Sequence, residues 1–230
     1  MIVPLLTRGE AIGTIGMPAR DPYHIFTKNE IELAETIASQ IAAAVDNAKL
    51  HAKTESELGV AERDLEIGRQ IQSGFFPETL PEISGWEIAT HFHAARQVAG
   101  DFYDVFQFRN STFTAFIIAD VCDKGVGAAL FMVLFRSLLR AFSEIKINTD
   151  NVQEQLLNII VNTNNFIAEY HGKSNMFATM FFGVLDPDTG IMSYVNGGHE
   201  PPIILDKHGS VIQRLMPTGP AVGMFPEMNF

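Results

Sequence analysis

The chain of 230 residues has one cysteine, few basic residues and no long uninterrupted apolar segment. The single Cys122 excludes an intramolecular disulfide and is typical of a reducing cytoplasm. Sixteen lysines and arginines against 27 acidic residues give a net charge of −11, which argues against a nucleic-acid binder. No apolar run reaches the roughly 18 residues of a membrane span, and no signal peptide is visible, so we expect a cytoplasmic protein.

The residues of two common kinds of active site are also missing. There is no cysteine pair or HExxH-like helix for zinc, and no convincing Ser–His–Asp or Cys–His set for a side-chain nucleophile. Chemistry in this chain would therefore depend on carboxylates, and oxygen ligands favour Mg²⁺ or Mn²⁺ over zinc.

The first 53 residues predict a hairpin followed by a long helix. Residues 2–6 and 11–17 alternate loosely around a turn, and Thr27 with Glu30 forms a capping box at a helix start. Apolar residues then recur at alternating spacings of three and four, at Ile31, Ala34, Ala38, Ile41, Val45, Ala48 and Ala52. This helix, over 28–53, either covers its own hairpin or serves as a dimerisation stalk.

The heptad pattern breaks at 54–57, and a second helical stretch follows until Pro77 and Pro81 end it. This stretch contains Gly59 and Gly68, each of which costs a helix about 1 kcal/mol relative to alanine. We therefore divide the chain into an N-terminal part at 1–50, a helical linker at 51–80 and a larger domain at 81–230.

The larger domain is predicted to be α+β, because short strands alternate with two long helices. The helices are expected over 128–143 and 152–170, and the strands over 87–95, 102–108, 113–119, 176–185, 191–195 and 202–205. The second and third of these strands are apolar on both faces, so their sheet should be covered on both sides. A layered α-β-β-α sandwich fits this pattern.

Two aspartates, Asp101 and Asp120, flank the first predicted hairpin of this domain. If its turn is centred between Asn110 and Ser111, paired residues sum to 221, and Asp101 faces Asp120. Like charges opposed on neighbouring strands, with Cβ atoms about 4.5–5.5 Å apart, are destabilising. A bound divalent cation would relieve this repulsion. The loop after Asp120, with Gly125 and a helix start, favours anions, which suits a phosphate beside the cation.

Three nearby residues are interpreted mainly as structural. Asp104 lies on the opposite strand face from Asp101 and is predicted to be a structural or supporting group. Asp123 is interpreted as a loop-capping residue and His199 as a turn-stabilising one. A contact with metal or phosphate for Asp123, and acid–base work for His199, are the alternatives.

Five ordered motifs resemble those of metal-dependent serine/threonine protein phosphatases of the PPM class, in the bacterial SpoIIE/RsbU branch. They are IQSGFFP at 71–77, ARQVAGDFYD at 95–104, ADVCDKGVGAAL at 119–130, MFATMFFGVLD at 176–186 and NGGHEPP at 196–202. Residues 1–50 resemble the last hairpin and C-terminal helix of a GAF sensor domain.

The resemblance implies hydrolysis of phosphoserine or phosphothreonine on a regulatory partner protein by water activated between two Mn²⁺ or Mg²⁺ ions, with no side-chain nucleophile. It implies Asp101 and Asp120 as metal ligands, the Val121 carbonyl as a third oxygen ligand, and Arg96 as a contact of the phosphate. The partner would be an anti-anti-sigma-type protein of sigma factor regulation. A signal from the GAF-like part would reach the phosphatase through the helical linker of a homodimer.

The sequence departs from the family pattern near its C-terminus. The family carries further metal carboxylates after the segment that 215–223 resembles, and this sequence has neither the Asp-Gly motif nor the late aspartate. We therefore expect a C-terminally incomplete domain that binds Mn²⁺ weakly and is a poorly active or inactive phosphatase. The alternative function is a catalytically incomplete regulatory or dimerisation module. A third interpretation is a structural scaffold in which Asp101 and Asp120 are merely exposed to solvent.

Overall fold

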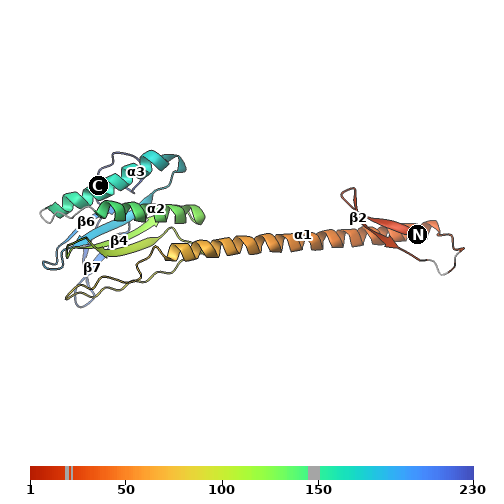
Figure 1. Cartoon of the computed structure of the whole chain (residues 1–230), viewed down its shortest axis with the longest axis horizontal. Coiled ribbons are helices and arrows are strands. Elements are labelled where there is room, and N and C mark those ends of the chain that lie inside the picture. The colour runs from red at the N-terminus through yellow and green to blue at the C-terminus, as the bar shows by residue number, and fades with distance from the viewer. Residues whose placement is uncertain (19–20, 22, 145–150) are drawn as a thin grey trace. The chain divides into compact units, whose positions relative to one another are not determined.

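The computed structural model describes residues 1–18, 21, 23–144 and 151–230, which fold as two compact units, Met1–Asp64 and Leu65–Phe230 (Figure 1). The long helix α1 (Lys28–Ser73) runs from the first unit into the second. The three-part functional division at residues 50 and 80 stays a prediction.

The N-terminal unit contains the predicted hairpin, formed by β1 (Ile2–Thr7) and β2 (Glu10–Gly16). Its turn places Arg8 and Gly9 at φ values of 52° and 88°, the left-handed conformation that a two-residue hairpin loop requires. Val3 of the hairpin packs with Ala34 and Ala38 of α1. One face of the helix therefore covers its own hairpin, as the first of the two interpretations predicts.

The helix α1 begins at the predicted capping box. The backbone N–H and the hydroxyl of Thr27 donate to Glu30 Oε2 at 2.7 and 2.8 Å, and the Glu30 N–H donates to Thr27 Oγ1 at 3.4 Å. The helix then continues through 54–57, so the predicted separation into two helices was wrong. Backbone hydrogen bonds do not depend on the heptad pattern, and the two interior glycines weaken a helix without ending it.

The C-terminal unit is α+β, as predicted. Its main sheet consists of four antiparallel strands in the spatial order β3 (Phe102–Gln107), β4 (Thr114–Val121), β5 (Ala178–Leu185) and β6 (Met192–Gly197). A separate two-stranded sheet contains β7 (Ile203–Leu205) and β8 (Val211–Arg214). Paired residues of β3 and β4 sum to 221, as in the pair Phe102 and Ala119, which confirms the predicted register.

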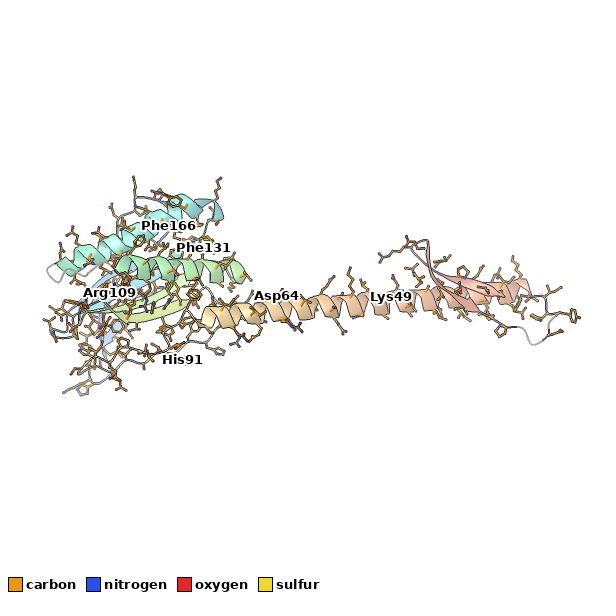
Figure 2. The ribbon with its side chains drawn as sticks, in the orientation of Figure 1. Lys49, Asp64, His91, Arg109, Phe131 and Phe166 are labelled. Atoms are coloured by element: carbon orange, nitrogen blue, oxygen red, sulfur yellow. The ribbon has the colours of Figure 1, made fainter. Side chains whose placement is uncertain are left out.

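Helices α2 (Val126–Ser143) and α3 (Val152–His171) lie on one face of the main sheet, and a short 3-10 helix, η2 (Gly172–Ser174), follows them (Figure 1). The core between helices and sheet includes the fully buried side chains of Phe102, Phe182, Met132, Phe135 and Ile160. Each such side chain stabilises the fold by about 1.5–3 kcal/mol. Figure 2 shows Phe131 and Phe166 on these helices, where both rings lie near His171.

Residues 87–95, which were predicted to form a strand, are an irregular segment that lies over the other face of the main sheet. This prediction was wrong. The ring of Phe92 packs on Phe76 and Tyr103, at centroid distances of 4.4 and 6.4 Å, so side-chain contacts hold the segment where no strand ladder forms. The described residues thus contain one helix layer, the main sheet and a small second sheet.

Helix α2 is the one helix in the described part of the chain that is long and apolar enough, by composition alone, to span a membrane, which the sequence analysis did not anticipate. Within this fold it is a core helix, and two arginines interrupt its apolar surface. Arg140 donates two hydrogen bonds to Asp104 of β3 at 2.6 and 2.7 Å, and Arg136 lies 3.1 Å from the same carboxylate. Asp104 is fully buried, which confirms its structural role.

Replacing Asp104 with alanine is expected to destabilise the protein by about 3–5 kcal/mol, because Arg136 and Arg140 would lose their counter-charge in a largely buried position. Urea denaturation followed by circular dichroism measures the loss. The control is Asp188→Ala at an exposed turn, which should change the free energy of unfolding by less than about 0.5 kcal/mol. Equal stability of the two variants would show that this ion pair does not hold β3 to α2.

Candidate metal centre

The candidate centre is the pair Asp101 and Asp120 at one end of the β3–β4 ladder. The outermost ladder pair is Phe102 with Ala119, and the next residue on each strand is one of the two aspartates. Their carboxyls are close enough to share a hydrogen bond. The predicted register therefore brings these two side chains together.

The electrostatics of the pair favour an added positive charge. Partial burial, the hydrogen bond to Asp120 and the charge of Asp120 together raise the pKa of Asp101 to about 6. Because the two carboxylates repel each other when both are ionised, a hard divalent cation bound by their oxygens would relieve the repulsion.

The Val121 carbonyl, the predicted third ligand, lies beside the backbone that leads into Asp101. A Cβ added at Gly100 would lie 2.9 Å from this oxygen and 3.1 Å from Ala128 Cβ, so a glycine is needed for the close approach. The resulting oxygen-only set fits Mn²⁺ or Mg²⁺. Across the described residues, no three histidine, cysteine, aspartate or glutamate side chains converge on a metal position.

Arg96, the predicted phosphate contact, lines a cleft of about 280 Å³ together with both aspartates. Lys124 and Gly125 line the same cleft. The Lys124 N–H donates to Asp123 Oδ1 at 2.8 Å, which supports the interpretation of Asp123 as a loop cap. Lys124 was not among the residues predicted from the sequence, although a lysine next to the N-cap residue Gly125, which makes no side-chain cap, is a recognisable signal for anion binding.

Gln72, close to the end of α1, holds the backbone that leads to Asp101. Its buried amide donates to the Ala99 carbonyl at 2.7 Å and accepts the Ala99 N–H at 3.0 Å. Gln72 lies within the first quoted motif, but nothing local indicates a partner 27 residues away. The structure thus adds a positioning contact that the sequence analysis missed.

His199 lies beside a second cavity of about 620 Å³, which also includes both aspartates. Its backbone N–H donates to Oδ1 of the buried Asn196 at 2.8 Å, a bond that holds the turn and does not involve the imidazole. Its Nδ1 lies 2.9 Å from Oγ1 of Thr179, the β5 partner of Asp120. Burial lowers the pKa of His199 against the opposing charges of Asp120 and Glu200, so the ring is neutral near pH 7.

The match to a family profile places the chain in the PPM class of phosphatases. The family profile described as "Stage II sporulation protein E (SpoIIE)" matches residues 110–230, more than half of the chain, and a GAF domain profile matches residues 1–45. The chain therefore belongs to the SpoIIE family, and its first 45 residues are similar to a GAF domain. Asp120 and Val121 lie inside the SpoIIE match, and Asp101 lies just before it.

Two curated relatives are similar to most of this chain. Protein IcfG of Synechocystis sp. strain PCC 6803 is 47% identical over 191 residues, covering 75% of this chain and 30% of the relative. The phosphoserine phosphatase RsbU of Bacillus subtilis is 25% identical over 167 residues, covering 73% of this chain and 47% of the relative. The chain therefore spans less than half the length of either relative.

Two solved structures are similar to parts of the chain. The RsbU and RsbW domains of Rv1364c from Mycobacterium tuberculosis match with a TM-score of 0.45 and 24% identity, covering 56% of this chain and 34% of that one. The PP2C phosphatase domain of SpoIIE from Bacillus subtilis, with a fragment of its regulatory domain, matches with a TM-score of 0.45 and 12% identity. The match covers 90% of this chain and 77% of that one. Family membership rests on the SpoIIE profile match.

The raised pKa of Asp101 predicts a pH-dependent stability in metal-free buffer. The folded protein binds the Asp101 proton more tightly than the unfolded chain, so this contribution is fully present below about pH 4 and is lost as the pH rises to about 6. Asp101→Asn should therefore melt at a higher temperature than the wild type at pH 7.5 with EDTA, and this advantage should shrink toward pH 4. Asp188→Asn is the control. An advantage of Asp101→Asn that does not vary with pH would contradict the prediction.

Proposed function

We propose that this chain is the phosphatase part of a signalling protein and hydrolyses phosphoserine or phosphothreonine on a regulatory partner protein. The observation that carries the proposal is the convergence of Asp101 and Asp120 beside the Val121 carbonyl. These three residues would hold Mn²⁺ or Mg²⁺, which when bound supplies water activation and neutralises phosphate charge. Arg96, in the adjoining cleft, would bind and orient the phosphate.

The proposed partner is a phosphorylated protein of the anti-anti-sigma type. Support comes from the similarity to RsbU, which is named a phosphoserine phosphatase, and from the GAF match that precedes the SpoIIE match. This layout suits a sensor that controls a phosphatase in signal transduction. We propose a cytoplasmic location on the same grounds, together with the single free Cys122.

A catalytically incomplete regulatory module is the second candidate function. The set of metal ligands favours it. Only two carboxylates converge among the described residues, whereas a site for two metal ions uses more than two carboxylate ligands. Such a module would keep the fold and its partner surface while turning over phosphate slowly or not at all.

A phosphate-release assay separates the two candidates. With Mn²⁺ and casein phosphorylated on serine, the wild-type chain should release phosphate, and Asp120→Asn should reduce the rate by about 100-fold or more, since losing one charge-stabilising group costs about 10²–10³ in kcat. Asp188→Asn should match the wild type. In parallel, Mn²⁺ should raise the melting temperature of the wild type and not that of Asp120→Asn.

Each combination of results has a distinct meaning. Stabilisation by Mn²⁺ without turnover would support the incomplete module. If Mn²⁺ neither stabilises the wild type nor supports turnover, the proposed function is overturned and the scaffold interpretation is the one that remains.

We also propose that the chain forms a homodimer through α1. Ala34 and Ala38 are buried under the hairpin, but Leu33, Ile37 and Ile41 remain 61%, 42% and 39% exposed. Their spacing of four residues puts them along one stripe of the helix. The same stripe on a second copy would bury these side chains in a helix–helix seam.

Sedimentation equilibrium at micromolar concentration tests the dimer. The wild-type chain should sediment as a dimer, and the double variant Ile37→Lys with Ile41→Lys should be monomeric, because two charges per helix would enter the seam. Ser39→Lys, at an exposed position off the stripe, is the control and should stay dimeric. A double variant that remains dimeric would exclude this stripe as the interface.

A further inference from the structure

We propose that His199 is a phosphate-binding residue of this centre, and that its Nε2–H donates a hydrogen bond to an oxygen of the bound phosphoryl group. The inference deepens the proposed function and rests on it. Its starting point is the place of His199 on a cavity that the aspartate pair also lines.

The turn that carries His199 is held rigidly. Asn196 is fully buried, accepts the His199 N–H, and donates from Nδ2 to the Leu215 carbonyl at 3.0 Å. The Asn196 carbonyl accepts the Thr218 N–H at 2.8 Å. Between them Gly198 has a φ of 68°, a left-handed conformation that glycine adopts without strain. The imidazole therefore begins from a fixed backbone position, which lowers the entropic cost of binding a ligand.

The ring itself is oriented by Thr179. Donation from Nε2–H requires the tautomer in which Nδ1 accepts the Thr179 hydroxyl across the 2.9 Å contact; the single proton of the neutral ring then resides on Nε2, for which the described residues provide no partner. This tautomer presents an N–H on the side of the ring away from Thr179. Two carboxylates line the same cavity as the ring, and they favour a donor over a lone pair. The ring is therefore preorganised as a hydrogen-bond donor.

The two cavities at the aspartate pair explain why a phosphoryl group is the ligand. One cavity contributes Arg96 and Lys124, and the other contributes His199, so each of the two cavities that adjoin the aspartate pair contains a hydrogen-bond donor. A tetrahedral phosphoryl group directs its oxygens toward both cavities at once. Phe116 and Phe181 also line the cavity that contains His199, and low polarity strengthens a hydrogen bond to an anion.

Phosphate affinity tests the inference directly. Isothermal titration of inorganic phosphate into the Mn²⁺-loaded chain should give a Kd about tenfold weaker for His199→Ala than for the wild type, with Mn²⁺ affinity changed less than about twofold. Thr179→Val should weaken phosphate binding by a smaller factor, and Thr179→Ser should restore it. His208→Ala, at the exposed β7–β8 turn, is the histidine-matched control and should bind phosphate as the wild type does.

A second measurement needs no metal. Imidazole ¹⁵N shifts of the metal-free chain should report a neutral His199 with the proton on Nε2, and Thr179→Val should disturb this pattern. A proton on Nδ1 would overturn the inference. Unchanged phosphate affinity in His199→Ala, with an active wild type, would overturn it while the proposed function stands. A Mn²⁺-loaded wild type that neither binds nor releases phosphate would overturn both.

Discussion

The antiparallel pairing of β3 with β4 is the constraint on which the site depends. A slip of one residue would move every side chain of a strand to the other face of the sheet, so it would expose Ile117 and bury Asp120 under the helices. The core therefore selects the register. The same register forces Asp101 and Asp120 together, which makes their mutual repulsion a direct cost of burying the apolar face.

One strand shows how position decides the role of a carboxylate. Asp101 and Asp104 are three residues apart near the start of β3, so they serve opposite faces of the sheet. Asp104 meets two arginines of α2 and stabilises the packing of helix on sheet. Asp101 meets another carboxylate, and its pKa rises. Stability and candidate chemistry are thus separated by the sheet itself.

The sequence predicted those parts of the fold and site that depend on neighbouring residues. The β3–β4 register followed from a single polar break at 109–112, and the start of α1 followed from Thr27 and Glu30. The contacts of Gln72 with Ala99 and of His199 with Thr179 depend on how distant segments pack, and no local signal reports that. The prediction of a strand over 87–95 was wrong because the alternation of apolar and polar residues shows which face of a segment is apolar. It does not show whether a neighbouring strand supplies hydrogen bonds.

The ion pair of Asp104 with Arg140 also acts at a distance. Arg140 is fourteen residues from Val126, where α2 begins, a separation of about 21 Å along the helix axis. A tilt of one degree about the ion pair would shift the start of the helix by roughly 0.4 Å over this length. A rotation of α2 about the salt bridge would therefore displace the loop that carries Lys124 by more than it displaces the helix beside Asp104. The ion pair with Asp104 therefore helps to fix the position of the loop that lines the cleft beside Asp101 and Asp120.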